Sequence, residues 1–215
     1  IHTQYSICEG AVKIDKLKEF CKKNKIKSLG LSDTYNLSGA LEFAENLTSV
    51  GTQPIIGTQI LFRYKKFMGL IPLIAKNYNG YKNIIKLSSK SYLENSEISN
   101  PHCELDDLIK NSDGIIVLTG SIKCMFGKLF NKGLLNEIEE ILNKLKKKFE
   151  DNVYIEIQRH NDVNEKDFEN YNLNISKKLE LPIIASNEIY YLNQEMFEAH
   201  DALMCIGEKT YVNDT

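Results

Sequence analysis

Arginine is scarce in this sequence, and its scarcity limits the ways in which the protein can bind nucleic acid. Among 27 basic residues only Arg63 and Arg159 are arginine, and the formal net charge is -2. Bidentate contacts to phosphates need guanidinium groups, and general affinity for DNA needs an excess of positive charge. The composition therefore argues against a surface that binds DNA by itself.

Cysteine pairs, long apolar runs and a signal peptide are also missing. The odd number of five cysteines and the absence of any CxxC pair suit a reducing compartment, where thiols act as small apolar side chains. No apolar run approaches the roughly 18 residues of a membrane span, and the sequence has no secretory signal. We therefore expect a cytoplasmic protein without a membrane partner.

The length and the two ends of the sequence indicate one domain of a longer chain. The 215 residues, of which 42% are hydrophobic, are enough for a well-buried core, and we expect a single domain over residues 1–215. The sequence begins without Met, inside what looks like a motif, and ends without a clear stop in its pattern. We expect it to be an N-terminal piece of a longer protein.

Short apolar runs alternate with amphipathic stretches along the whole chain, which predicts alternating strands and helices. The expected strands are residues 28–33, 54–62, 70–75, 114–119, 153–158 and 182–186. The expected helices are residues 14–21, 37–47, 81–92, 134–149, 168–179 and 195–205. Leu41 is expected on the apolar face of the second helix, and Ile85 and Tyr92 on that of the third.

About seven βα units imply an α/β fold with a mainly parallel sheet, a distorted TIM-like βα barrel. Residues 94–101 are expected to form a surface excursion.

Polar and ionisable residues follow the ends of the expected strands. They are His2, Glu9, Asp33, Thr34, Gln59, Ser121, His160, Glu188 and Tyr190. In a βα barrel the loops after the strands meet at one face, where imidazole and carboxylate groups could bind zinc, manganese or iron. Four of these residues, however, are neutral and weak as ligands. The pattern indicates a site without naming a reaction.

Each candidate also has a structural interpretation. His160 could be a hydrogen-bonded structural residue, Asp33 could cap the following helix, and Glu188 could be a loop carboxylate. His102 and His200 lie away from strand ends, which favours a structural role for both. The lysines of residues 144–148 are expected to form the solvated face of a helix.

Several segments together resemble a known family. Residues 2–11 (HTQYSICEGA) resemble the motif HxHTxxSxxDG, whose first histidine would fall before residue 1, and residues 31–39 (LSDTYNLSG) resemble TDHxNLxG. Residues 53–59 (QPIIGTQ) are similar to KPIxGxE, and residues 154–160 and 185–188 complete the match. The family is the polymerase-and-histidinol-phosphatase (PHP) domain at the N-terminus of bacterial DNA polymerase III α subunits. Residues 75–92 resemble these polymerases rather than free-standing phosphatases.

The resemblance implies a set of metal ligands, of which this sequence keeps only a part. Metal-loaded members bind up to three divalent ions and hydrolyse phosphate esters, including the 3′ end of DNA. The ligands kept are His2, Glu9 (for Asp), His160 and Glu188 (for Asp). The positions that have lost their ligand are Thr34 (for His), Gln59 (for Glu), Leu70 (for His), Ser121 (for Cys) and Tyr190 (for His). Asp33 and Asn187 are expected to contact the ligand residues and hold them in position without binding the metal themselves.

The resemblance therefore implies a catalytically degenerate PHP domain that holds no metal, or one weakly bound zinc, manganese or iron ion. It would act as a scaffold that stabilises the rest of the α chain and docks the proofreading exonuclease subunit. The parent chain would be a DNA-directed DNA polymerase, a magnesium-dependent nucleotidyltransferase of DNA replication that holds the DNA, and the isolated fragment would be inactive.

Two enzymatic alternatives stay open at this point. The four retained ligands could support a residual metal-dependent 3′–5′ exonuclease or phosphoesterase on a reduced metal site. Two-metal hydrolysis needs a pair of ions to clamp the attacking and leaving oxygens, and four ligands suit one ion better than a pair. A free-standing phosphatase of the histidinol-phosphate type is disfavoured by residues 80–83, which match the polymerases.

Overall fold

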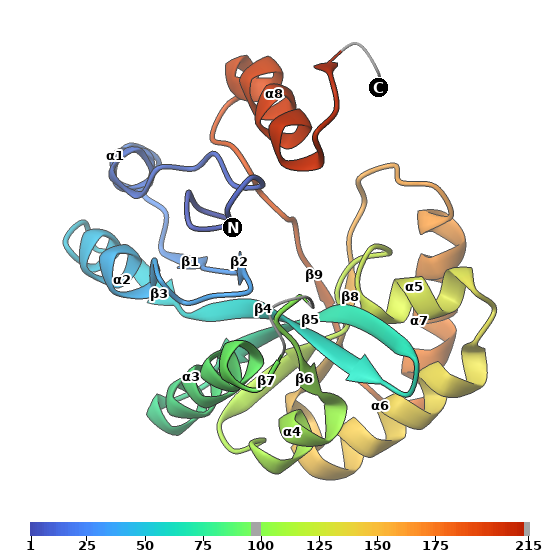
Figure 1. Cartoon of the computed structure of the whole chain (residues 1–215). Helices are drawn as coiled ribbons and strands as arrows, with labels where there is room; N and C mark the ends of the chain where they lie inside the picture. Colours follow the sequence, from blue (N-terminus) through green and yellow to red (C-terminus); the bar gives the residue numbers. More distant parts are fainter. Residues whose placement is uncertain (96–99, 213–215) are drawn as a thin grey trace. The chain divides into compact units, whose positions relative to one another are not determined.

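The computed structural model describes residues 1–95 and 100–212, and its fold is α/β (Figure 1). The chain forms two compact units, which are described separately below. Unit 1 consists of Ile1–Thr58 and Glu188–Thr215, and unit 2 consists of Gln59–Asn187. The organisation as one domain over residues 1–215 stays a prediction. Half of the expected surface excursion, residues 96–99, lies outside the described residues.

Unit 1 begins with a βαβ arrangement. Helix α1 (Ile14–Asn24) buries Ile14, Leu17 and Cys21, as the sequence predicted from their helical spacing. Strands β1 (Ser28–Gly30) and β3 (Gln53–Ile55) pair in parallel, and helix α2 (Ala40–Thr48) lies between them in the sequence. Parallel neighbours need such a crossover connection, which α2 supplies.

The core of unit 1 combines the inner faces of α1 and α2. It consists of Val12, Ile14, Leu17, Cys21, Leu31, Ala40, Phe43 and Leu47. Leu41 was expected on this apolar face of α2 but is 69% exposed, because the buried face runs through Ala40, Phe43 and Leu47 instead. The remaining elements of unit 1 are the short strand β2 (Asp33–Thr34), the 3₁₀ turn η2 (Gln194–Met196) and helix α8 (Phe197–Glu208).

The sheet of unit 2 contains β4 (Gly57–Tyr64), whose first two residues belong to unit 1, β5 (Phe67–Ala75), β7 (Ile115–Leu118), β8 (Val153–Ile157) and β9 (Ile183–Ala185). They are hydrogen-bonded in that order, and β6 (Cys103–Glu104) pairs in parallel with β4. Strands β7, β8 and β9 are parallel, whereas β5 is antiparallel to β7. The sheet is open. The fold is therefore the expected distorted βα barrel, but its strands do not close into a complete ring.

Helices α3 (Tyr78–Leu93), α4 (Leu105–Lys110), α6 (Leu135–Phe149) and α7 (Glu165–Leu179) lie around these strands (Figure 1). Helix α6 buries its predicted stripe from Ile138 to Phe149. In α3, by contrast, Ile85 and Tyr92 are exposed, and the buried residues are Gly80, Ile84, Leu87 and Ser91. Ile84 is therefore buried as predicted, whereas the expected burial of Ile85 and Tyr92 was wrong.

Two short helices were not expected from the sequence. Helix α4 is capped by Glu104, whose side chain accepts from the third residue of the helix, Asp107, while Asp107 accepts from the backbone of Glu104. Helix α5 (Met125–Asn131) buries four of its seven residues and so shows no amphipathic period. Among the described residues, every helix is too short or too polar to cross a membrane.

Candidate functional site

A fully buried carboxylate, Asp33, organises the N-terminal loop of unit 1. Its oxygens accept hydrogen bonds from the backbone nitrogen of Thr3 at 2.6 Å, the hydroxyl of Thr3 at 2.7 Å and the hydroxyl of Ser6 at 2.7 Å. Asp33 does not cap α2, because the N-cap residue of that helix is Gly39. A buried charge that accepts several hydrogen bonds is the arrangement that burial requires. Asp33 therefore fixes the loop that carries His2.

The imidazole of His2 is 1% exposed and lies at the centre of the polar residues of unit 1. Its Nδ1 is 3.3 Å from the hydroxyl oxygen of Ser6 and 3.4 Å from that of Thr34. Its Nε2 is 3.4 Å from a carboxylate oxygen of Glu188. The ring stacks on Tyr190, with centroids 4.4 Å apart and planes 15° from parallel. Four predicted site residues, His2, Thr34, Glu188 and Tyr190, are thus brought together.

The hydrogens of the two hydroxyl groups determine which imidazole nitrogen carries the proton. Ser6 donates its hydroxyl hydrogen to Asp33, and Thr34 donates its own to Glu9 at 2.6 Å. The Nδ1 atom of His2 therefore faces oxygen lone pairs, and we assign the hydrogen to Nδ1 on this basis.

His2 and Glu188 have the separation of two ligands of one metal ion. Two ligand atoms about 2.0–2.1 Å from a tetrahedral zinc ion are roughly 3.4 Å apart, the distance found here. A catalytic zinc site takes about three protein ligands, however. Within unit 1, no group of three or more His, Cys, Asp and Glu side chains of the described residues is arranged to hold an ion. The described residues of unit 1 do not fit a pair of metal ions.

Glu9 is held in place by its neighbours, and its role as a metal ligand stays a prediction. One carboxylate oxygen accepts the Thr34 hydroxyl, and the backbone carbonyl of Glu9 is 2.7 Å from Nε2 of His200. The backbone nitrogen of Ala11 donates to the carbonyl of Tyr190 at 2.7 Å, which fastens the same loop to the segment after Glu188. His200 is therefore a structural residue, in agreement with the expectation from the sequence.

A tyrosine on the same loop completes the polar surroundings. The hydroxyl of Tyr5 donates to the carboxylate of Glu42 at 2.7 Å, and this hydrogen bond and the charge of Glu42 raise the pKa of Tyr5. The carbonyl of Tyr5 accepts from the side chain of Asn36 at 2.9 Å. Tyr5 thus keeps its proton over the physiological range and ties the N-terminal loop to α2.

The other predicted site residues lie in unit 2; they are His160, Asn187, Leu70, Gln59 and Ser121. His160 follows β8 and is exposed, and its backbone nitrogen donates to Glu165 at 2.8 and 2.9 Å. Asn187 follows β9 and is also exposed, while Leu70 is a half-buried residue of β5. Gln59 and Ser121 are buried, and the hydroxyl of Ser121 accepts from the backbone nitrogen of Lys123 at 3.3 Å. The metal-binding role assigned to His160 stays a prediction.

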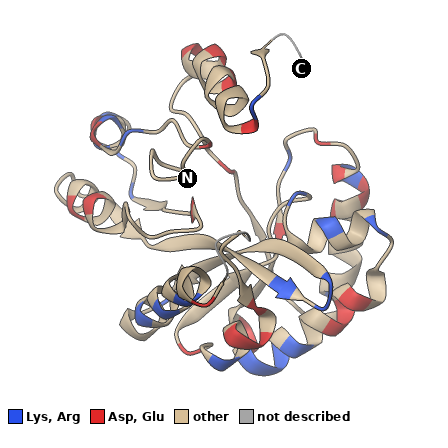
Figure 2. Ribbon diagram, viewed as in Figure 1, with Lys and Arg blue, Asp and Glu red and all other residues tan. Residues whose placement is uncertain are grey.

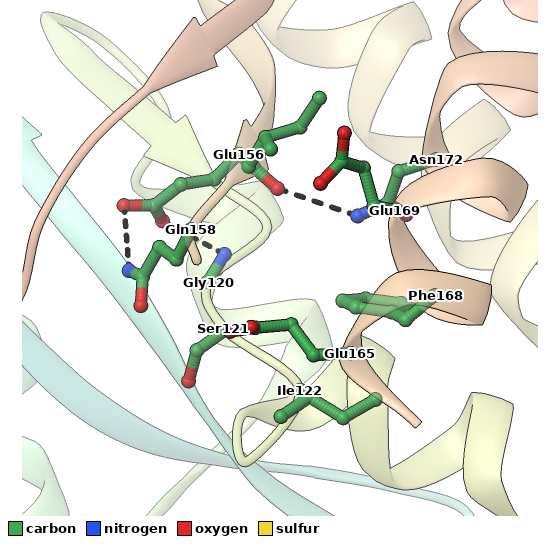
Figure 3. A pocket seen from close by; sticks show the side chains of 10 residues that line it. Gly120, Ser121, Ile122, Glu156, Gln158, Glu165, Phe168, Glu169 and Asn172 are labelled. Carbon is green, nitrogen blue, oxygen red and sulfur yellow. Dashed lines mark hydrogen bonds between the residues drawn. The ribbon is translucent and has the colours of Figure 1, made fainter. Parts of the chain in front are cut away.

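Sequence reasoning did not single out Glu156 of β8, a buried carboxylate (Figure 3). It accepts hydrogen bonds from the backbone nitrogen of Gly120 at 3.0 Å, from the side chain of Gln158 at 3.1 Å and from the hydroxyl of Ser186. A charged residue in the middle of the apolar run from Val153 to Ile157 was the signal that could have revealed it. Two of its partners, Gly120 and Ser186, come from loops far away in the sequence, and no local pattern indicates them.

The pocket beside Glu156 is too small for a substrate. It is lined by Gly120, Ser121, Ile122, Glu156, Ile157, Gln158, Glu165, Phe168, Glu169 and Asn172 (Figure 3). Its volume of about 10 Å³ has room for no more than about one water molecule. The hydrogen bonds of Glu156 to Gly120, Gln158 and Ser186 hold the loops around β8 in place within unit 2.

Comparison with known proteins identifies the family. Residues 1–160 match the PHP domain profile. The chain is 32% identical to the DNA polymerase III subunit alpha of Caulobacter vibrioides over 221 residues, covering 99% of this chain and 19% of that protein. It is 35% identical to the subunit of the same name from Rickettsia felis, covering 95% of this chain and 17% of that protein. The chain thus spans less than a fifth of the length of these relatives.

Solved structures agree on the fold at low sequence identity. A candidate metal-dependent phosphoesterase from Bifidobacterium adolescentis superimposes with a TM-score of 0.58 at 14% identity, covering 88% of this chain and 86% of that chain. An amidohydrolase from Chromobacterium violaceum, solved with sulfate and no metal, gives 0.57 at 9% identity, covering 94% of both chains. The profile match over most of the chain, the similarity to polymerase III α subunits over nearly all of it and the shared fold show that this chain belongs to the PHP domain family.

Proposed function

We propose that the chain is the PHP domain of a replicative DNA polymerase III α subunit and that it acts as a metal-poor scaffold. The parent chain would be a DNA-directed DNA polymerase that uses magnesium at carboxylates outside these residues. The scaffold would stabilise that polymerase and dock the proofreading exonuclease subunit. Similarity to α subunits over 95–100% of this chain supports the identity of the parent.

One observation carries the metal-poor interpretation: the surroundings of His2 are closed by neutral groups. Thr34 and Ser6 lie on the Nδ1 side, Tyr190 covers one face of the ring, and Glu188 lies at Nε2. A cluster of divalent ions needs several anionic or imidazole ligands to balance its charge. Because hydroxyl and phenol groups surround His2 instead of such ligands, any metal ion bound there would be held weakly.

Metal analysis of protein purified without chelators tests this interpretation. We expect well under one equivalent of zinc, manganese or iron, with no change in the His2→Ala variant. Two or more equivalents, lost in His2→Ala, would contradict the scaffold role of this site and require ligands beyond His2 and Glu188. Protein unfolded and refolded with added zinc gives the matched control for metal lost during purification.

The separation of His2 and Glu188 favours one alternative, a residual metal-dependent phosphoesterase or 3′–5′ exonuclease. Hydrolysis of a model phosphodiester in the presence of manganese or zinc tests it directly. Activity that depends on His2, Glu188 and His160 together would establish the alternative, whereas activity unchanged in all three alanine variants would indicate a contaminating enzyme.

Docking of the exonuclease is tested with the exonuclease subunit of the same organism. Size-exclusion chromatography and calorimetry should show a one-to-one complex with this chain. If the complex forms only with the full-length α subunit, the docking surface lies outside these residues and the scaffold role is limited to stabilising the polymerase.

A further inference from the structure

A pocket of about 240 Å³ lies in unit 2 beside the turn that joins β4 and β5. It is lined by Lys66, Phe67, Met68, Met125, Lys128, Leu129, Asn131 and Lys132. The floor is apolar, because Met125 and Leu129 come from the buried side of α5, and Phe67 and Met68 come from the start of β5. Met68 is 36% exposed, so this apolar surface is reachable from solvent. An open apolar pocket marks a binding surface more often than a scattered apolar residue does.

Three lysines surround this floor, and no carboxylate lines the pocket. Within the part of the chain that the structure describes, Lys66, Lys128 and Lys132 have no acidic partner within 4.0 Å. The ammonium groups of Lys66 and Lys132 lie 5.5 and 5.3 Å from the centre of the Phe67 ring. Cation–π contacts of this kind hold the charges at the mouth of the pocket without neutralising them. Basic residues are visible at the β4–β5 turn and on α5 in Figure 2.

Several other lysines of unit 2 pair with nearby carboxylates, whereas the three lysines of this pocket gather around one apolar floor without such a pair among the described residues. Lys65 and Lys144 both pair with Glu140 at 3.0 Å, and Lys123 pairs with Asp162 at 2.8 Å. A second depression, of about 400 Å³, is lined by four basic residues and by Glu104, Asp106 and Asp107, so most of its positive charge is offset by carboxylates. The pocket on α5 is left with an apolar floor and an unbalanced positive rim.

We propose that this pocket binds an acidic peptide segment of a partner protein that inserts one apolar side chain between Lys66, Lys128 and Lys132. The volume is below the roughly 300–1,000 Å³ of small-molecule sites but accommodates a single large side chain. Two methionines in the lining provide the adaptable contacts typical of peptide-binding surfaces. Aspartate and glutamate residues flanking the inserted side chain would complement the three ammonium groups. The inference concerns the chemistry of the segment and does not depend on which protein carries it.

The methionine methyl groups provide the test, because two of the four methionines lie in the pocket. Met68 and Met125 line it, whereas Met196 and Met204 belong to unit 1 and serve as internal references. The 215-residue chain, labelled with ¹³C at the methionine methyls, is titrated with a short peptide of Asp and Glu residues around one Phe. We expect saturable shifts of the Met68 and Met125 signals and no shift of the other two.

Three matched ligands make the result specific. A peptide with Ala in place of Phe should bind at least roughly tenfold more weakly, since burying a Phe side chain contributes about 1.5–3 kcal/mol. A peptide with Lys in place of the acidic residues should not shift the signals at all. Equal binding of the Phe and Ala peptides would overturn the proposal, as would shifts of the same two methyls by oligodeoxythymidine stronger than those by the acidic peptide.

Charge reversal on the rim separates the pocket from general attraction to a basic surface. The double variant Lys128→Glu, Lys132→Glu changes only exposed side chains and is expected to weaken binding at least about tenfold, with a loss of its salt dependence. The control is Lys147→Glu, Lys148→Glu on the solvated face of α6, which makes the same change in net charge. Similar losses in both variants would show that the acidic peptide is bound by overall charge, and the pocket would carry no role. Circular dichroism checks that each variant is folded.

Discussion

The Ser6 hydroxyl and the Asp33 carboxylate are 2.7 Å apart, joined by a hydrogen bond that spans 27 residues of sequence. The same hydroxyl oxygen also accepts the backbone nitrogen of Thr34 at 3.1 Å. Ser6 therefore links the N-terminal loop to β2 and, through its position beside Nδ1, sets the orientation of the His2 ring. The most polar part of unit 1 is held together by hydrogen bonds, whether or not it binds an ion.

The substitution Asp33→Asn is expected to lower the free energy of unfolding by about 2–4 kcal/mol. An amide in place of the carboxylate loses charge-assisted hydrogen bonds and turns donors toward Thr3 and Ser6, which are donors themselves. Urea unfolding followed by circular dichroism measures the change. Asp151→Asn, at an exposed position, is the control and should stay within about 0.5 kcal/mol of the original protein. A similar result for both variants would contradict the structural role of Asp33.

Glu140 predicts a specific dependence of stability on pH. The hydroxyl of Tyr64 and the ammonium groups of Lys144 and Lys65 lower the pKa of Glu140 from an ordinary value of 4.5 to about 2. A carboxyl with a lowered pKa stabilises the fold fully above pH 4.5, and this contribution is lost as the pH falls toward about 2. The difference in unfolding free energy between the original protein and Glu140→Gln should therefore shrink over this interval. A constant difference would show that Glu140 is not paired in solution; exposed Glu45→Gln is the reference.

Cysteine accessibility predicts the course of thiol modification. Cys8 is half-buried, whereas Cys21, Cys103, Cys124 and Cys205 are buried. Burial raises the pKa of the Cys103 thiol to about 12 and also raises that of Cys21, so these thiols are not ionised at pH 8. Ellman's reagent should modify a single thiol rapidly in the native protein and the rest only after unfolding. The rapid phase should disappear in Cys8→Ser, and its persistence there would show that a buried thiol is transiently exposed.

Gly80→Ala should destabilise the protein by about 1–3 kcal/mol, although alanine is the better helix former. A β-carbon at Gly80 would lie 1.8 Å from the carbonyl oxygen of Gly114, which also accepts from the backbone of Lys76 at 2.8 Å. The start of α3 would have to move away from the loop before β7. Gly30→Ala, where a β-carbon meets nothing within 4 Å, is the matched control. Thermal unfolding of the two variants distinguishes a steric effect from the general effect of replacing glycine.

The sequence predicted the elements that have a strong amphipathic period and missed those that do not. The stripes of α1 and α6 are buried as expected, because each packs a single face on the core. Helix α5 was missed because it is buried on most sides, and the face of α3 was misplaced because Gly80 packs closely on Gly114. Close approach of two backbones outweighs the burial of the larger Ile85 and Tyr92 side chains, and spacing alone does not reveal it.

In the candidate site, too, local sequence patterns predict some features, whereas others depend on contacts between residues that are distant in the sequence. Of the polar residues expected at strand ends, His2, Thr34, Glu188 and Tyr190 lie together in unit 1, although His2 and Tyr190 are far apart in the sequence; the metal-binding role of the whole set stays a prediction. The buried role of Glu156 depends on Gly120 and Ser186, which approach it only in the folded chain. The antiparallel direction of β5 relative to β7 likewise depends on the β4–β5 turn, which periodicity does not orient.

Strand β9 ends the hydrogen-bonded order of the unit 2 sheet and is only three residues long. Ile183 at its start is 43% exposed. An open sheet carries unpaired backbone donors and acceptors at its edge, and these can recruit strands from other molecules. Because this edge offers so few of them, self-association through strand addition is held to a short, weak contact. Although the sheet does not close into a barrel, its open edge at β9 is therefore a weak site for aggregation.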